Sequence, residues 1–227
     1  MAEDDTGSRG AELDLLVRKL RGCIHRGDFV PGQRLVEADL VADTGMSRGR
    51  VRDALRILES DGLVQIHRNR GATVRWISRK EVADTIELMR PISVLMIDKA
   101  ITRAVEPEVR AILTEALAQA RRFREQLSEF EQSRLFMDQN ARFWDVFAGL
   151  SNNLVLIDTR MRLETTLFRL ALEGARITSA KGQWIARHED ILEAVLAGDR
   201  DLALKLAEES VLDVEQAMLA LPDSAFR

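Results

Sequence analysis

The sequence has very little cysteine, with Cys23 as the only one among 227 residues. One cysteine excludes an intrachain disulfide framework and any metal site built from several thiolates. Long apolar runs are also missing, and residues 1–10 lack the apolar stretch of a secretory signal peptide. These absences predict a protein of the reducing cytoplasm with no membrane-spanning segment.

Patterns that accompany catalysis are missing as well. No glycine-rich phosphate loop follows a predicted strand, and none of the three histidines lies in a metalloprotease motif. Cys23 falls on an amphipathic helix, where we expect it to serve as a small hydrophobe. An enzyme would need acid and base groups that converge on a cavity, and the sequence shows no such pair. We therefore predict that the protein is not an enzyme.

The charge is distributed unevenly along the chain. The net charge is −4, yet residues 1–80 hold 15 basic and 12 acidic side chains, whereas residues 81–227 hold 18 and 25. Residues 46–80 alone carry nine basic and three acidic side chains. A basic patch on an acidic protein is expected where one surface meets phosphate. A solvated charged face is the alternative, and charge alone does not decide between them.

The first third of the chain has the pattern of a winged helix. Apolar spacing predicts helices over residues 11–25, 36–43 and 48–60. Alternating apolar residues then predict two strands, over 63–67 and 72–76. Three helices followed by a hairpin define a winged helix-turn-helix, which we place at residues 11–78.

The third predicted helix has two distinct faces. Ser47 is a good N-cap for it. Its apolar residues fall on one side and are expected in the core: Val51, Ala54, Leu55 and Leu58. Arg48, Arg52 and Arg56, spaced by four, line the neighbouring side. Arginine can pair bidentately with guanine, so this side is a candidate for the major groove, although surface ion pairs with Asp53 or Glu59 are the alternative.

The rest of the chain is predicted to be helical. Glycine, asparagine and proline breaks separate six expected helices, at residues 80–104, 107–128, 130–149, 152–174, 180–197 and 200–220. Pro91 lies inside the first of them and is expected to kink it. The fold class is therefore mainly α, with an antiparallel helical bundle at residues 80–221 behind the winged helix.

Residues 24–75 resemble the GntR family of bacterial regulators. The resemblance rests on segments in the family's order and spacing: Ile24-His25-Arg26-Gly27, Pro31-Gly32-Gln33-Arg34-Leu35-Val36-Glu37, Met46 to Leu55, Leu58 to Val64, and Asn69-Arg70-Gly71-Ala72-Thr73-Val74. It implies operator contacts from the third helix and from the wing. The residues to which we assign this role are Arg34, Ser47, Arg48, Gly49, Arg50, Arg52, Arg68, Arg70 and Gly71.

Residues 80–221 resemble the ligand-sensing (FCD) domain of the FadR subfamily. The resemblance rests on helix number and length, on Phe143 followed by Ser151-Asn152-Asn153, and on Arg187 to Ala194 followed by Gly198-Asp199. Many members hold a divalent metal with one Asp and three His. Matching the motifs places Asn140, Trp144, His188 and Ser210 at those four positions. Trp144 has no lone pair to offer and serine is a poor ligand, so we predict no metal and no cofactor.

The same positions are expected to surround a metal-free effector pocket, formed by Arg90, Asn140, Trp144, His188 and Ser210. In the subfamily an arginine matching Arg90 often faces the effector's carboxylate, and a protonated or hydrogen-bonding His188 could assist it. Trp144 would supply an apolar wall, which favours an aromatic or aliphatic acid. The alternatives are a buried structural His188 and a simple core role for the aromatic residues.

Together these patterns predict a ligand-responsive DNA-binding regulator, a homodimeric repressor released from its double-stranded operator by a small carboxylic acid. An acyl thioester is a second effector class implied by the resemblance. A constitutive or architectural DNA-binding dimer, whose bundle binds no effector, is the alternative function. Tight packing without a cavity would favour that alternative.

Overall fold

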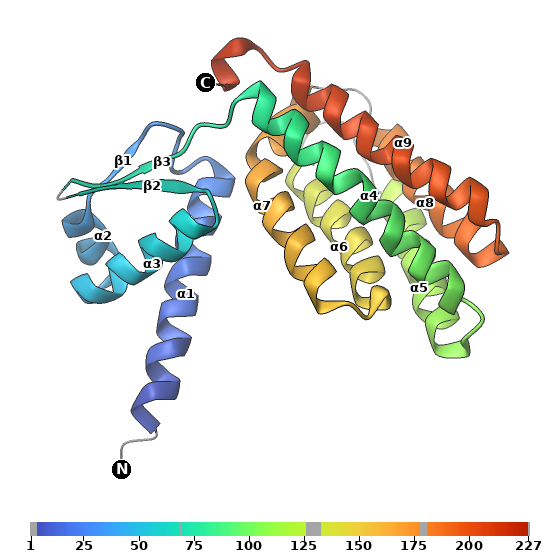
Figure 1. Cartoon of the computed structure of the whole chain (residues 1–227), viewed down its shortest axis with the longest axis horizontal. Coiled ribbons are helices and arrows are strands. Elements are labelled where there is room, and N and C mark those ends of the chain that lie inside the picture. The colour runs from blue at the N-terminus through green and yellow to red at the C-terminus, as the bar shows by residue number, and fades with distance from the viewer. Residues whose placement is uncertain (1–3, 69, 126–132, 178–180, 227) are drawn as a thin grey trace. The chain divides into compact units, whose positions relative to one another are not determined.

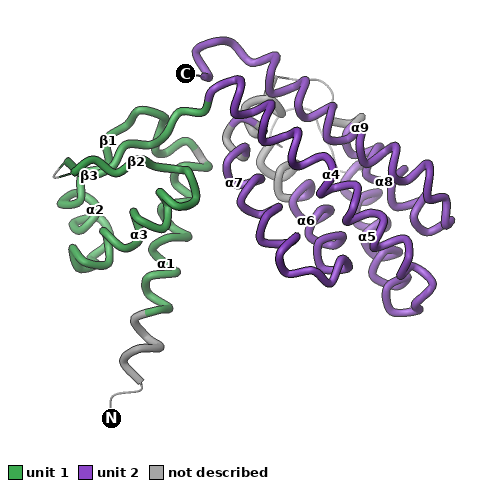
Figure 2. The backbone as a smooth tube through the Cα atoms, viewed as in Figure 1, with its two compact units in different colours: residues 1–77 green, residues 78–227 purple. Residues whose placement is uncertain are grey.

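The computed structural model describes residues 4–68, 70–125, 133–177 and 181–226. The chain divides into two compact units, Met1–Ile77 and Ser78–Arg227 (Figure 1, Figure 2). The first contains helices and a small sheet, and the second is built from helices in the part that is described. The mainly α fold with a winged helix-turn-helix is therefore confirmed.

Within its described residues, the first unit contains three helices and three strands in the order of a winged helix. They are α1 (Asp4–Arg26), β1 (Arg34–Leu35), α2 (Glu37–Thr44), α3 (Arg48–Ser60), β2 (Val64–His67) and β3 (Gly71–Val74). The apolar face of α3 meets Leu16 and Leu20 of α1 in one buried cluster. Val51, Ala54 and Leu58 of that face are completely buried, as the spacing predicted. Burying one face of α3 leaves its other face to solvent.

The wing has a strand that the sequence analysis missed. The sheet order is β1-β3-β2, and both pairings are antiparallel. Arg34–Leu35 has only two residues, too few to show an alternating pattern, and it becomes a strand because it pairs with β3. Strand β3 also ends at Val74 rather than at Trp76 as predicted.

The second unit contains six α-helices within the described residues. They are α4 (Arg79–Arg103), α5 (Pro107–Glu125), α6 (Ser133–Ser151), α7 (Leu154–Ile177), α8 (Lys181–Ala197) and α9 (Arg200–Leu219). Helix α4 packs along α9 and also contacts α6 and α7 (Figure 1). The core lies among these helices, where Met96, Ile97, Leu113, Phe147 and Ile191 are buried.

Helix α4 begins with a capping box. The Ser78 hydroxyl accepts a hydrogen bond from the Glu81 amide at 3.1 Å, and the Glu81 carboxylate accepts one from the Ser78 amide at 2.9 Å. This exchange satisfies two amides that a helix start leaves without partners. The helix continues through Pro91 to Arg103. In the described residues, no helix is both long and apolar enough to cross a membrane.

Candidate DNA-reading surface and ligand cavity

The first candidate surface is the solvent-facing side of α3. Ser47 has an extended backbone (φ −66°, ψ 154°), and its hydroxyl accepts a hydrogen bond from the Arg50 amide at 3.4 Å. This N-cap fixes where the helix starts, and it leaves other first-turn amides available to an anion. Arg48, Gly49 and Arg52 are exposed beyond it. The fold therefore presents this side of α3 to solvent.

The arginines of α3 differ in what they contact. Nε of Arg52 lies 2.8 Å from the Glu37 carboxylate of α2, with 60 % of the Arg52 side chain exposed. Arg50 is half-buried and pairs with Glu12 of α1. Arg56 pairs with Asp53 at 3.1 Å, which is the alternative considered for it from the sequence. Arg52 is a loosely held arginine, because an exposed ion pair of this kind is weak.

The wing holds the remaining predicted DNA contacts. Nε of Arg34 donates to the Arg70 carbonyl at 2.9 Å, so β1 supports the wing tip. Arg68 and Arg70 are exposed, and Asn69 between them lies outside the described residues. Gly71 has φ 79°, and a Cβ there would lie 2.4 Å from the Leu35 carbonyl oxygen. Only glycine fits this position, because β1 passes directly beside it.

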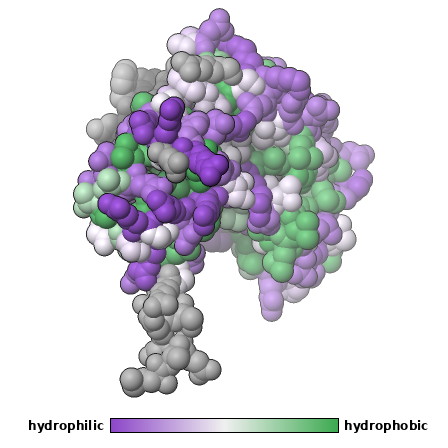
Figure 3. Space-filling view, turned by 60° about the vertical axis from the view of Figure 1, so that its left-hand side comes forward, coloured by the Kyte–Doolittle hydropathy of each residue, from purple (hydrophilic) through white to green (hydrophobic). Residues whose placement is uncertain are grey.

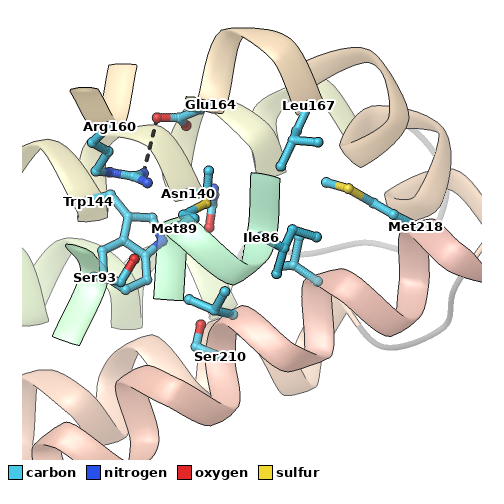
Figure 4. Close-up of a pocket in the computed structure, with 12 residues that line it drawn as sticks. Ile86, Met89, Ser93, Asn140, Trp144, Arg160, Glu164, Leu167, Ser210 and Met218 are labelled. Atoms are coloured by element: carbon cyan, nitrogen blue, oxygen red, sulfur yellow. Dashed lines mark ion pairs between the residues drawn. The ribbon is translucent and has the colours of Figure 1, made fainter. Parts of the chain in front are cut away.

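The second unit contains a cavity between α4, α6, α7 and α9. The space that atoms leave empty there is about 510 Å³, and part of it is open solvent. Asn140, Trp144 and Ser210 line it, so three of the five predicted pocket residues lie together (Figure 4). Arg90 and His188 are not among its lining residues.

Arg90 is held beside α9. Its guanidinium lies 3.9 Å from Glu208 and 3.7 Å from Glu215, and about a third of its side chain is exposed. Two carboxylates already compete for this arginine, so it is poorly prepared to receive a third. The effector-binding role of Arg90 stays a prediction, and Arg90 does not line the cavity.

His188 is buried and stacked flat on Phe143. The two ring centroids are 3.9 Å apart and the planes differ by 8°. Burial, assisted by the nearby positive charge of Arg160, lowers the pKa of His188 to about 3. The imidazole is therefore neutral near pH 7 and brings no positive charge to an anion. This environment is that of a core histidine, the alternative considered from the sequence.

The cavity also contains two charged residues that the sequence analysis did not select. Arg160 and Glu164 of α7 form an ion pair at 3.0 Å, and their side chains are 4 % and 22 % exposed (Figure 4). The Arg160 guanidinium lies over the Trp144 ring, 5.0 Å from its centroid. The sequence contains a pattern that could have identified both residues. Leu156, Arg160, Glu164 and Leu167 follow at spacings of four, four and three, which puts two charges on an apolar helix face.

These side chains do not suit a divalent metal. Among the described residues, no three His, Cys, Asp or Glu side chains cluster closely enough to hold one. Trp144 offers no lone pair, and the buried guanidinium of Arg160 places a positive charge where a cation would have to bind. Arg160 could instead pair with a negatively charged group of a ligand, and Glu164 with a positively charged one.

Family comparisons agree with the architecture of both units. Residues 14–74 match "Bacterial regulatory proteins, gntR family", and residues 84–212 match the FCD domain. A DNA-binding winged helix joined to a helical FCD domain defines a class of transcription regulators. The chain belongs to the GntR family and is a member with an FCD domain.

Individual relatives are also regulators. The chain is 27 % identical over 135 residues to the HTH-type transcriptional regulator YdhC of Bacillus subtilis (strain 168), a match that covers 60 % of this chain and 58 % of YdhC. It is 23 % identical to the gluconate operon transcriptional repressor of the same organism, over 95 % of this chain and 86 % of the repressor. Among solved structures, E. coli McbR/YncC has the same fold, with a TM-score of 0.73 at 19 % identity over 89 % of this chain and 94 % of that one.

Proposed function

We propose that this protein is a ligand-responsive repressor, which binds operator DNA as a homodimer in the cytoplasm and leaves it when a small organic acid binds the FCD domain. The observation that carries the proposal is the pair of faces on α3. One face is buried in the first unit, and the other presents Arg48 and Arg52 to solvent. A major groove admits a helix presented in this way.

The proposed DNA contacts divide by their chemistry. Arg48 and Arg52 read base edges, because arginine can pair with O6 and N7 of guanine. The start of α3 contacts the phosphate backbone through Ser47, Gly49 and Arg50. Backbone amides at this helix N-terminus and the positive charge of Arg50 bind the phosphate oxygens. The wing residues Arg34, Arg68, Arg70 and Gly71 contact the minor groove or its phosphates.

The homodimer has support from exposed apolar side chains of the second unit. Leu88 and Leu95 of α4 are 50 % and 43 % exposed, and they lie seven residues apart on one side of the helix. Helix α7, which packs against α4, exposes Leu154 and Met161 at the same spacing. Figure 3 shows hydrophobic residues gathered on an exposed face of the second unit. A second copy of the chain is the occupant that we propose for this apolar surface, because paired half-sites need two recognition helices.

The cavity supports an effector over the architectural alternative. A bundle that only dimerises would not require a cavity lined by a buried arginine. An acid that binds one arrangement of the dimer better than another shifts the population away from the DNA-binding form. One relative described above is named as the transcriptional repressor of the gluconate operon, and gluconate is a small organic acid.

The experiment begins by selecting a site for the full-length protein from random duplex DNA. We expect a palindromic site, bound with an affinity that falls steeply with salt because phosphate contacts release counterions. Small carboxylic acids are then titrated against the complex, and at least one class should release the DNA. Selection that yields no common sequence would contradict the proposal, and so would a complex that no acid affects.

A further inference from the structure

The Arg160–Glu164 pair lies in the cavity rather than on the surface. Both residues line the cavity, and the two side chains are 4 % and 22 % exposed. Removing charges from water is costly, and apolar residues of similar size often serve a helix core equally well. A charge pair retained on the apolar face of α7 therefore indicates a role beyond packing, and buried charges that face a cavity are characteristic of ligand sites.

A second group in the cavity lacks a partner. The Ser93 hydroxyl of α4 is fully buried, and among the described residues it has no hydrogen-bond partner. It lines the same cavity, as do the Asn140 amide of α6 and the Ser210 hydroxyl of α9 (Figure 4). A buried hydroxyl without a partner calls for an explanation, and a polar group of a bound ligand supplies one.

The balance of charge in the cavity restricts the ligand. Arg160 and Glu164 together are neutral, and Asp145 adds a further negative influence on Arg160. A simple carboxylate would place a second acid beside Glu164 around one guanidinium, leaving a net negative charge in a poorly solvated space. A zwitterion brings one charge of each sign, so it can exchange partners with the pair and leave the cavity neutral.

The geometry of the pair matches a particular zwitterion. In an α-amino acid the carboxylate and the ammonium are attached to one carbon, and Arg160 and Glu164 are one helical turn apart with their charged atoms 3.0 Å from each other. The other lining side chains are mostly apolar: Ile86, Met89, Leu167, Val211, Val214 and Met218. Such walls suit an apolar side chain and reject a polar one.

We propose that the cavity binds an α-amino acid with an apolar side chain, its carboxylate on Arg160 and its ammonium on Glu164. The Ser93 hydroxyl donates to the carboxylate or accepts from the ammonium, and the Trp144 ring forms part of the wall. This inference rests on the proposed function, since it names the kind of acid that the FCD domain binds. It assigns the carboxylate to Arg160 instead of Arg90.

The test measures binding to the full-length protein by isothermal titration calorimetry. L-leucine, L-methionine and L-phenylalanine are each compared with the acid that lacks only the amine, for example leucine with 4-methylpentanoate. At least one amino acid should bind about tenfold or more tightly than its amine-free acid, because only the amino acid satisfies Glu164. Equal or tighter binding of the amine-free acid overturns the inference, and so does the absence of binding by all six compounds.

The substitution Glu164→Gln tests whether Glu164 binds the ammonium group of the ligand. The amide keeps the shape of the side chain but removes its charge, so amino-acid affinity should fall to about that of the amine-free acid, whose own affinity should not decrease. Glu208→Gln is the matched control, because Glu208 contacts Arg90 and does not line the cavity. A Glu164→Gln protein that is folded by circular dichroism yet retains the preference for the amine overturns the inference.

Measuring the release of operator DNA distinguishes a failure of this inference from a failure of the proposed function. Amino acids that bind in the calorimeter but leave the DNA complex intact support the inference and contradict the release mechanism. Amine-free acids that bind and release the DNA, when no amino acid binds, support the release mechanism and overturn the inference.

Discussion

At the scale of single residues, Arg52, which we propose reads base edges, is held by an acidic neighbour when no DNA is bound. It is mostly exposed and pairs with Glu37 at 2.8 Å. Binding a guanine requires it to leave this carboxylate, whose charge also repels nearby phosphate. The pair therefore aligns the arginine and opposes DNA binding at the same time.

Substitution of Arg48 or Arg52 by alanine should weaken operator binding by about 1–3 kcal/mol and relax selectivity at one base step. Glu37→Gln should raise affinity, by up to about fivefold, because an exposed ion pair is worth about 1 kcal/mol or less. Fluorescence anisotropy with the selected operator measures both effects. Arg56→Ala is the control, since Arg56 pairs with Asp53 on the same helix. Parent-like binding by both Arg48→Ala and Arg52→Ala would exclude this face from the groove.

The lowered pKa of His188 predicts that the stability of the protein depends on pH. Its pKa is lowered to about 3 in the folded protein, against about 6.5 in an unfolded chain. Below about pH 6.5 the unfolded state therefore binds a proton that the folded state does not. Stability contributed by this site is intact above that pH and falls by about 1.4 kcal/mol per pH unit as the pH decreases toward 3.

His188→Phe should make the free energy of unfolding less sensitive to acid between about pH 6 and pH 4.5. Phenylalanine retains a flat ring against Phe143 and removes the proton-binding group. Urea titrations at several pH values measure the difference in slope between variant and parent. His67→Gln, at an exposed site on β2, is the control and should keep the parent's slope. Parallel slopes for parent and His188→Phe would show that His188 does not cause the acid sensitivity.

At the scale of elements, the wing depends on the close approach of β1 and β3. Gly71 begins β3 at φ 79°, and the Leu35 carbonyl of β1 occupies the space of a Cβ. Pairing of Arg34 with Thr73 and of Leu35 with Ala72 requires this approach. The glycine thus permits the strand that supports Arg70 at the wing tip.

Gly71→Ala should destabilise the first unit more than Gly45→Ala does. Both glycines have positive φ, which costs alanine about 1–2 kcal/mol, but a Cβ at Gly45 meets nothing within 4 Å. Only the Gly71 variant must also push β1 away from β3. Thermal unfolding followed by circular dichroism measures stability, and operator binding reports on the wing. Equal losses of thermal stability in the two variants would mean that the positive φ alone, and not the contact with β1, causes the destabilisation.

At the scale of the whole molecule, the proposed function depends on the pairing of two copies of the chain. The combined Leu88→Asp and Leu95→Asp change places charges on the proposed contact surface of α4. We expect a monomer in sedimentation experiments and operator affinity lower by about 100-fold or more, because the two half-sites are then bound independently. Ile112→Asp on α5, where Ile112 is 47 % exposed, is the matched control. A dimer that persists in the double variant would place the interface elsewhere.

The local features of the fold follow from the sequence alone. The two faces of α3, its Ser47 cap, the hairpin and the bundle helices follow from apolar spacing and capping residues, because these act between neighbours in the chain. The two-residue strand β1 did not follow, since it exists only through pairing with β3.

Which polar residues share the cavity depends on how the helices pack against one another. Asn140, Trp144 and Ser210 line one cavity, whereas Arg90 is held by Glu208 and Glu215 and His188 is stacked on Phe143. Helical spacing shows which face of α7 carries Arg160 and Glu164, but not which helices that face meets. Long-range packing makes that choice, because it sets where four separate helix faces enclose a common space.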